Sequence, residues 1–144
     1  MKIAILGTVH PKGLEFLKEN DLEIFEVTNF NNQNLQEELK FVDAILLRTS
    51  RLDKDILEHC KKLKIISRHG VGYDNVDLDY LNKKKIALCI TSTSNAVSVA
   101  EHVMSFFLYL TKNLSLSDKL VKGGNFTQRS ELPNFFELYK KKLL

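Results

Sequence analysis

The residues whose types and spacing most suggest chemistry are two glycines, Gly70 and Gly72, within the stretch HGVGYDNVDL at His69–Leu78. Glycine adopts backbone angles that are closed to other residues, so the N–H groups around Val71 and Gly72 can turn toward a small anion. Asn75 stands where a dinucleotide fingerprint would have its third glycine, so the stretch does not form a G-x-G-x-x-G turn. The pair indicates either a small-anion site or simply a tight turn between a strand and a helix.

No second glycine turn, metal site or nucleophile is evident elsewhere. Gly7 follows the first apolar run, but the next glycine is Gly13 and Pro11 lies between them, so the first strand does not form a dinucleotide site. The four histidines lack metal-ligand spacing and have no Ser or Cys partner; His102 is expected to pack inside the protein. We therefore predict no metal site and no catalytic residue of these types.

The two cysteines, Cys60 and Cys89, form no Cys-x-x-Cys pair and lie far apart in the sequence. A disulfide framework or a zinc site is therefore not expected. We predict that both are small core residues of a cytoplasmic protein, where thiols stay reduced.

Composition places the chain among globular domains. It has 144 residues, of which 44% are hydrophobic and 27% charged, and a formal net charge of +3. This length supports one domain plus an appendage. Lysine pairs lie at the ends of expected helices, where they favour the helix dipole, so a nucleic-acid partner is not indicated. The most apolar later segment, Val97–Leu110, is interrupted by polar residues and is shorter than the roughly 20 residues that span a bilayer.

Short apolar runs alternate with segments of helical spacing, which is the βαβ pattern of a doubly wound parallel sheet. The expected strands are Ile3–Leu6, Glu23–Val27, Ala44–Leu47, Lys64–Ser67 and Ile86–Ile90, and the expected helices are Pro11–Asn20, Asn34–Phe41, Lys54–Cys60 and Asp77–Lys83. Asp53 and Asp77 are expected to cap the third and fourth helices. The sequence therefore predicts an α/β fold with five parallel strands.

The segment Asn95–Asn113 is predicted to form a longer helix that is apolar on most of its circumference. Such a helix must be covered on more than one side. Either Asn95 or Ser98 can cap it, the latter through a capping box with Glu101. A second helix at Ser115–Lys122 and a loop at Asn125–Asn134 are expected to follow.

His69–Leu78 resembles the G-x-G-x-D-N-[VI]-D signature of the D-isomer-specific 2-hydroxyacid dehydrogenases, the family that includes phosphoglycerate dehydrogenase, glyoxylate/hydroxypyruvate reductase and formate dehydrogenase. Other segments are similar to the same family in the same order. Leu47–Ser50 resembles its Arg/Ser loop, Asn95–His102 its N-x-x-S-V-A-E-H helix start, and Lys122–Gly124 the K-x-G step before its nucleotide domain. The resemblance covers essentially the whole chain.

The resemblance implies a flavodoxin-like substrate-binding domain over residues 1–94, with strand order 2-1-3-4-5, and over 95–144 a bridging helix and the start of an NAD-binding domain. It implies NAD as the cofactor and a small 2-hydroxy or 2-oxo acid as the substrate. The loop at Gly70, Val71 and Gly72 would hold the substrate carboxylate through backbone N–H groups. Asn95 would touch the substrate, and Ala96 would lie near the nicotinamide.

Two arginines are further candidate anion ligands under the same resemblance. Arg48 follows the third predicted strand, and Arg68 lies two residues before Gly70. Each arginine has an alternative role without a ligand. Arg48 would then be a surface arginine beside Asp53 or Asp55. Arg68 would then only pair with Asp74 or Asp77. Both alternatives remain open at this point.

The family's acid–base histidine, the glutamate that orients it and the arginine that polarises the carbonyl lie beyond the nucleotide fingerprint, and no position of this sequence matches them. Glu137–Leu143 resembles the approach to the first strand of the nucleotide domain, and the sequence stops where the G-x-G-x-x-G would start. We therefore expect the main NAD site to be missing, and no hydride transfer by these 144 residues alone.

Two other interpretations were weighed against the substrate-binding portion of a dehydrogenase. One is an interaction or dimerisation module derived from that domain, in which the apolar helix binds a second copy of the chain. The other is a response-regulator-like or unrelated flavodoxin-like protein, but the acidic cluster and the FMN phosphate loop of those proteins are absent from the sequence. The dehydrogenase interpretation is the one that the sequence favours.

Overall fold

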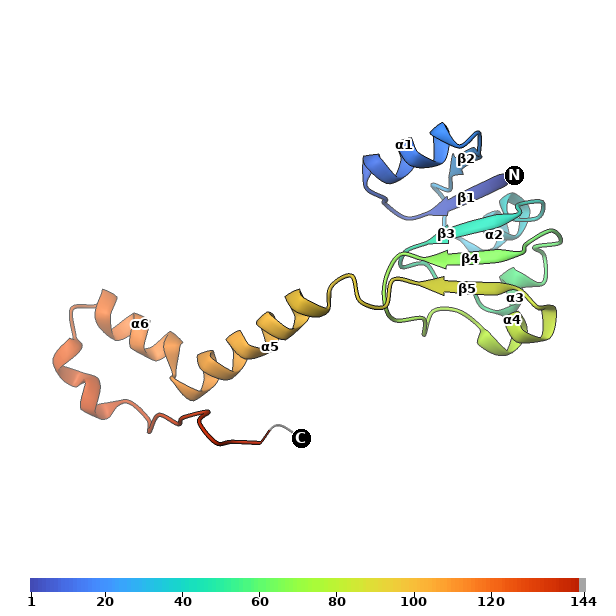
Figure 1. Cartoon of the computed structure of the whole chain (residues 1–144). Helices are drawn as coiled ribbons and strands as arrows, with labels where there is room; N and C mark the ends of the chain where they lie inside the picture. The colour runs from blue at the N-terminus through green and yellow to red at the C-terminus, as the bar shows by residue number, and fades with distance from the viewer. Residues whose placement is uncertain (143–144) are drawn as a thin grey trace. The chain divides into compact units, whose positions relative to one another are not determined.

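The computed structural model describes residues 1–142 and divides the chain into two compact units, Met1–Ser94 and Asn95–Leu144 (Figure 1). The first unit is built on a sheet of five strands, all parallel, in the order β2-β1-β3-β4-β5. The strands are β1 (Lys2–Leu6), β2 (Glu23–Glu26), β3 (Ala44–Leu47), β4 (Ile65–Arg68) and β5 (Ala87–Ile90). The predicted α/β fold and strand order are confirmed.

Four helices connect these strands: α1 (Pro11–Glu19), α2 (Asn32–Glu38), α3 (Lys54–Leu57) and α4 (Leu78–Lys84). Pro11 begins α1, as predicted, because its missing N–H needs no partner in the first turn. Asp77 caps α4 by accepting a hydrogen bond from the Tyr80 N–H at 2.9 Å. Asp53 also precedes its helix, α3, but its side chain makes no capping bond. Of the two predicted aspartate caps, only Asp77 therefore forms a capping hydrogen bond through its side chain.

The core lies on one face of the sheet, where alternate strand residues meet the helices. Leu6, Leu47 and Ile66 are fully buried there. Since successive side chains of a strand point to opposite faces, Ser67 of β4 faces the other side, and it is exposed. Cys60 is buried in the core as predicted, but Cys89 of β5 is exposed. The prediction for Cys89 was wrong because the second face of the sheet is covered less completely than the first.

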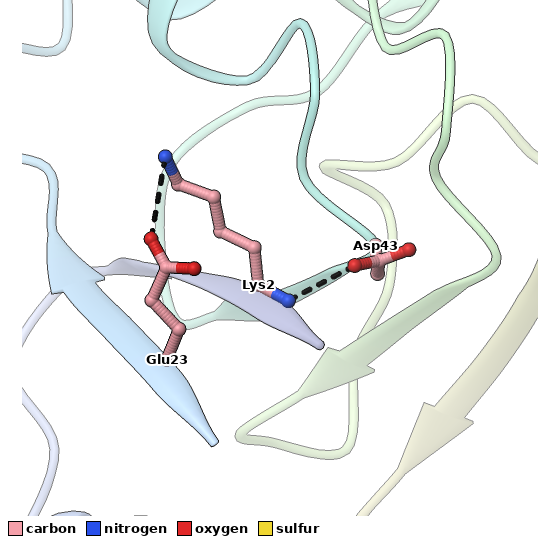
Figure 2. Close-up of polar contacts among 3 residues, drawn as sticks. All are labelled: Lys2, Glu23 and Asp43. Atoms are coloured by element: carbon pink, nitrogen blue, oxygen red, sulfur yellow. Dashed lines mark hydrogen bonds and ion pairs between the residues drawn. The ribbon is translucent and has the colours of Figure 1, made fainter. Parts of the chain in front are cut away.

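Lys2 connects β1 to Glu23 at the start of β2 and to Asp43 just before β3 (Figure 2). Its backbone N–H donates to Asp43 Oδ2 at 2.9 Å, and its ammonium lies 3.6 Å from Glu23 Oε1. Lys64 Nζ approaches the other oxygen of Asp43 at 3.5 Å. The hydrogen bond from the Lys2 backbone, assisted by Lys64, holds the pKa of the Asp43 carboxyl below its usual value. The carboxylate form of Asp43 therefore stabilises the entry to β3.

The second unit contains α5 (Ala96–Thr111), α6 (Leu114–Lys122) and the 3-10 helix η1 (Phe126–Glu131). Asn95 occupies the cap position of α5 without a side-chain bond, and Ser98 lies inside the helix. The capping box at Ser98 therefore does not start this helix. η1 replaces part of the predicted loop, since short polar segments can close i→i+3 bonds such as Gln128 N–H to Asn125 O at 2.9 Å.

No described residue of the second unit is buried. Apolar side chains on several sides of α5 are exposed, among them Phe106 and Leu110. His102, predicted to pack inside, is exposed and lies edge-on to the Phe106 ring with 4.2 Å between ring centroids. Residues 137–142, the described part of the predicted approach to a nucleotide domain, form a turn in irregular chain, and Leu143 lies outside the described residues. No helix within residues 1–142 is long and apolar enough to cross a membrane.

Candidate functional site

The two glycines follow β4 directly, in a segment that we call the glycine loop (residues 69–72). Gly70 N–H donates to Arg68 O at 2.9 Å, and Gly70 O accepts from Thr91 N–H at 3.1 Å, beyond the end of β5. Gly70 has φ +156°, a conformation that side chains disfavour, and a Cβ at this position would overlap the Arg68 guanidinium. Glycine is therefore required at position 70.

Gly72 is needed less strictly. Its φ is not positive, and a Cβ would stand 3.6 Å from Asp74 Oδ2, an ordinary contact distance. The expectation that both glycines adopt backbone angles closed to other residues therefore holds only for Gly70. Position 72 can carry a small side chain without displacing its neighbours.

The N–H groups of Val71 and Gly72 are the open donors of the glycine loop. Within residues 1–142, neither donates a hydrogen bond to a protein acceptor, and both residues are exposed. Neighbouring N–H groups without an acceptor form a concave site for a carboxylate or another small anion. The structure thus retains the anion-binding interpretation of this turn.

The chain after the glycine loop is held in place by the segment that follows β3. Asn75 Nδ2 donates to Ser50 O at 2.7 Å, and Asn75 O accepts from Leu52 N–H at 2.8 Å. Asp77 N–H in turn donates to Leu52 O at 3.1 Å, just before its carboxylate caps α4. Both ends of the loop are therefore attached to the segments that follow β5 and β3, which fixes the position of its open N–H groups.

Arg48 lies at the same edge of the sheet as the glycine loop, since Leu47 pairs with Arg68 across β3 and β4. Its Nη1 donates to Thr8 O at 3.0 Å, and its backbone N–H donates to Leu6 O at 2.9 Å. The close approach requires Gly7, where a Cβ would lie 2.9 Å from Arg48 Cβ. Arg48 therefore packs on the turn between β1 and α1, and its guanidinium contacts that turn and not the glycine loop.

The carboxylate partners considered for the two arginines are not found. Among the described residues, neither Arg48 nor Arg68 forms an ion pair with an aspartate; Asp53 instead pairs with Arg51 at 3.9 Å. Asn95 and Ala96 belong to the second unit, at the start of α5. The Asn95 side chain makes no capping bond and Ala96 is exposed, so both remain available to a ligand.

A mainly apolar hollow of about 300 Å³ borders the glycine loop and was not anticipated from the sequence. His69 of the loop, Ser67, Leu46 and His10 contribute to its walls. It forms where the second face of the sheet is left open. Its walls come from chain segments that are distant in sequence, so no local pattern indicates it.

A second hollow, of about 440 Å³, lies between α3 and α4. Its walls combine lysines with Glu58 and Asp79, so it presents no uniform charge to a ligand. Burial, reinforced by the nearby Glu58 carboxylate, raises the pKa of Tyr80 in its wall. Across residues 1–142, no group of three or more His, Cys, Asp or Glu side chains could hold a metal ion.

Neither glycine turn of the first unit fits a dinucleotide pyrophosphate. After β1, the N–H of Lys12 at the start of α1 is already bonded to His10 Nδ1 at 3.3 Å, and Pro11 has no N–H to offer. After β4, the glycine loop is separated from α4, which begins only at Leu78. A Rossmann site needs a glycine turn that opens directly into a helix N-terminus. Neither of these two turns therefore has the geometry of a Rossmann pyrophosphate site.

Comparison with known proteins identifies the family. The pattern of the family "D-isomer specific 2-hydroxyacid dehydrogenase, catalytic domain" matches residues 3–137. The chain belongs to this family. D-3-phosphoglycerate dehydrogenase of Archaeoglobus fulgidus is 27% identical over 130 residues, which make up 90% of this chain and 25% of that protein. The sequence resemblance is thereby confirmed.

Two solved structures show the same fold. D-lactate dehydrogenase from Aquifex aeolicus, solved with NAD and lactic acid, is 30% identical with a TM-score of 0.76, over 93% of this chain and 40% of that one. A protein from Pyrococcus horikoshii is 24% identical with a TM-score of 0.85, over 96% and 43% of the two chains. The chain spans about a quarter of the phosphoglycerate dehydrogenase and less than half of these two solved chains.

Proposed function

We propose that this chain is the N-terminal substrate-binding portion of an NAD-dependent D-2-hydroxyacid dehydrogenase, and that the glycine loop holds the carboxylate of a small 2-hydroxy or 2-oxo acid. The observation that carries the proposal is the pair of open N–H groups at Val71 and Gly72, at the carboxyl end of β4. Ligands of open α/β sheets bind at this end of the strands. Family membership supplies the class of substrate.

The chemistry of the loop suits a carboxylate. Each N–H that donates a hydrogen bond to a charged oxygen contributes roughly 1.5–3 kcal/mol to the free energy of binding. A millimolar dissociation constant corresponds to a net binding free energy of about 4 kcal/mol, after the entropy of association is included. Two such bonds therefore support millimolar affinity. Arg48 and Asn95 are proposed as additional substrate contacts. Gly70 acts indirectly, by allowing the backbone turn.

NAD is proposed as the cofactor of the whole enzyme, because relatives such as the Aquifex aeolicus D-lactate dehydrogenase were solved with it. When bound, it supplies the hydride acceptor or donor of the reaction. Ala96 is the one residue of this chain proposed to lie near the nicotinamide. Because the described residues do not fit the pyrophosphate, we propose that the 144-residue polypeptide assayed alone transfers no hydride.

The second unit supports an additional or alternative role as a dimerisation module. Val97, Phe106 and Leu110 of α5 expose 72%, 54% and 69% of their surfaces. Apolar patches of this kind on a helix mark interaction sites. We propose that α5 binds the same helix of a second copy, whether or not the chain takes part in catalysis. The free thiols of Cys60 and Cys89 support a cytoplasmic location.

The test of the carboxylate site is an amide-shift titration of the ¹⁵N-labelled chain with glyoxylate. We expect the Val71 and Gly72 amides to shift with a dissociation constant on the order of millimolar. Gly72→Ala keeps the N–H and should bind as the parent does, whereas Gly72→Pro removes the N–H and should abolish the shifts. Glycolaldehyde, which lacks the carboxylate, serves as the ligand control.

The outcomes separate the parts of the proposal. Glyoxylate shifts confined to other residues, or equal binding by Gly72→Pro, would refute the site. Calorimetry with NADH is expected to show no micromolar binding by this polypeptide. Micromolar binding would mean that these residues hold a dinucleotide in a way that the glycine turns do not indicate.

A further inference from the structure

Arg68, the last residue of β4, folds its side chain back over the start of the glycine loop. Its Nη1 donates to the His69 carbonyl, while its own carbonyl accepts the Gly70 N–H at 2.9 Å. Both bonds engage a single peptide unit, the one that joins His69 to Gly70. A planar trans peptide with both its C=O and its N–H held can no longer rotate. Arg68 therefore determines the orientation of the first peptide of the loop.

The next peptide unit of the loop, which joins Gly70 to Val71, is held from the end of β5. Its carbonyl, that of Gly70, accepts the Thr91 N–H at 3.1 Å. Because the C=O and N–H of a trans peptide point in opposite directions, the Val71 N–H must point away from Thr91. This N–H is one of the two open donors. The Thr91 bond thus sets the direction of this N–H, and the peptide that Arg68 holds fixes the position from which the Gly70 carbonyl reaches Thr91.

The space that the guanidinium occupies exists only because residue 70 has no side chain. The heavy atoms nearest to a Cβ at Gly70 would be Nη1, Cζ and Nη2 of Arg68, all within overlap or close-contact distance. An alanine at position 70 would expel the guanidinium, since the end of a flexible side chain moves more readily than backbone. The position of the Arg68 guanidinium therefore depends on glycine at position 70.

The arginine is held at the loop without a carboxylate partner. Its Nε is inaccessible to solvent and has no hydrogen-bond acceptor among the described residues. No aspartate or glutamate within residues 1–142 forms an ion pair with it. An inaccessible donor without an acceptor destabilises a fold by itself. The side-chain hydrogen bond that the guanidinium does make is the one to the glycine loop.

We infer that Arg68 is a positioning residue, which occupies the space of the missing Gly70 side chain and holds the His69–Gly70 peptide so that the Val71 N–H faces the carboxylate of the ligand. The inference rests on the proposed function, which it deepens. The guanidinium acts through the peptide that it holds and not as a direct ligand. Its shape, and not only its charge, is therefore essential.

The experiment compares Arg68→Met, which removes the charge, with Arg68→Lys, which keeps the charge but lacks the planar fork. Glyoxylate is titrated into each ¹⁵N-labelled chain while the Val71 and Gly72 amides are followed. We expect both variants to weaken binding about tenfold and to accelerate hydrogen exchange of the Gly70 amide without ligand. Arg51→Met, which removes an exposed arginine of the same charge, is the matched control and should bind within about twofold of the parent.

A second pair of variants tests whether Gly70 and Arg68 act together. Gly70→Ala should weaken glyoxylate binding as Arg68→Met does, and the double variant should bind no more weakly than Gly70→Ala alone. Additive losses would overturn the inference, as would parent-like binding by Arg68→Lys. If the parent chain shows no glyoxylate shift, the proposed function fails. The exchange rate of the Gly70 amide in Arg68→Met then still decides whether Arg68 holds the loop.

Discussion

The two units of the chain differ in how far they bury their apolar side chains. In Met1–Ser94, Leu47 and Ile66 lie at the centre of a closed core with no exposed surface, whereas in Asn95–Leu144 the equally apolar Phe106 and Leu110 remain largely exposed. A parallel sheet with helices packed on it can bury its own apolar face, but a pair of short helices cannot. The first unit therefore buries much of its own apolar surface, whereas the second leaves large apolar side chains exposed.

The difference also separates the proposed roles. The glycine loop belongs to the first unit and is attached at its two ends to the segments that follow β5 and β3. Binding sites are more precise when rigid elements support them. The proposed association site, in contrast, is an open helix surface without its own core. The proposed ligand site and the proposed association surface therefore lie in units that differ in how they bury apolar side chains.

The largest expected effect comes from matched truncations in the two units. Leu47→Ala should lower the free energy of unfolding by about 2–5 kcal/mol, because it leaves a cavity in the core. Leu110→Ala removes an exposed side chain and should change it by less than about 0.5 kcal/mol at a concentration where the chain is monomeric. Urea denaturation followed by circular dichroism measures both. Equal effects would contradict the division into a closed and an open unit.

The two cysteines distinguish the core from the open face of the same sheet. Burial raises the pKa of the Cys60 thiol to about 12, while Cys89 is exposed. Because the thiolate is the reactive form, iodoacetamide at pH 8 should modify Cys89 at least about a hundred times faster than Cys60. Mass spectrometry of timed samples gives the two rates. In strong denaturant the rates should become equal, and a fast Cys60 in the folded chain would be inconsistent with a closed core.

Association through α5 is tested by a charge on its exposed surface. Phe106→Glu should weaken dimerisation at least about tenfold, because burying a carboxylate in an apolar interface is unfavourable. Val121→Glu places the same charge on the exposed surface of α6 and should leave dimerisation unchanged. Sedimentation velocity over a range of concentrations measures both. A parent chain that remains monomeric at high concentration would refute the proposed dimer.

The smallest effect is expected at Asp43, where stability should depend on pH. The pKa of Asp43 is lower in the folded chain than in the unfolded one, so the unfolded chain binds the proton more readily. Its contribution is fully present above the unfolded pKa of about 3.9 and is lost as the pH falls through the lower folded pKa. Asp43→Asn should therefore lower stability slightly at pH 7 and at pH 5, and the difference should close below about pH 4. A difference independent of pH would exclude this role.

Much of the fold could be predicted because the sequence patterns of strands and helices lie within short stretches of neighbouring residues. Alternating apolar runs predicted all five strands to within a residue or two, and Pro11 and Asp77 indicated where helices begin. The loop at 125–134 was predicted wrongly because a 3-10 helix needs only local hydrogen bonds and has no apolar period. Elements with a strong local pattern can therefore be predicted from the sequence, and segments with a weak pattern cannot.

The candidate site was predicted in part for the same reason. Gly70 and Gly72 indicated a turn with accessible N–H groups, and the structure places that turn at the end of β4. The hollow lined by Leu46 and Ser67 could not be predicted, because it is formed by chain segments distant in sequence. Nor could the exposure of Cys89, which depends on what covers the second face of the sheet.

By itself, the sequence determined the family, the parallel α/β fold and the position of the glycine loop, since motif spacing and apolar periodicity are properties of neighbouring residues. Only the tertiary structure decided which loop groups are open. It assigned the Arg48 guanidinium to Thr8 and the Arg68 guanidinium to the peptide before Gly70, and it left the Val71 N–H without an acceptor among residues 1–142. Hydrogen-bond partners depend on which strands become neighbours, and that neighbourhood exists only after the chain has folded.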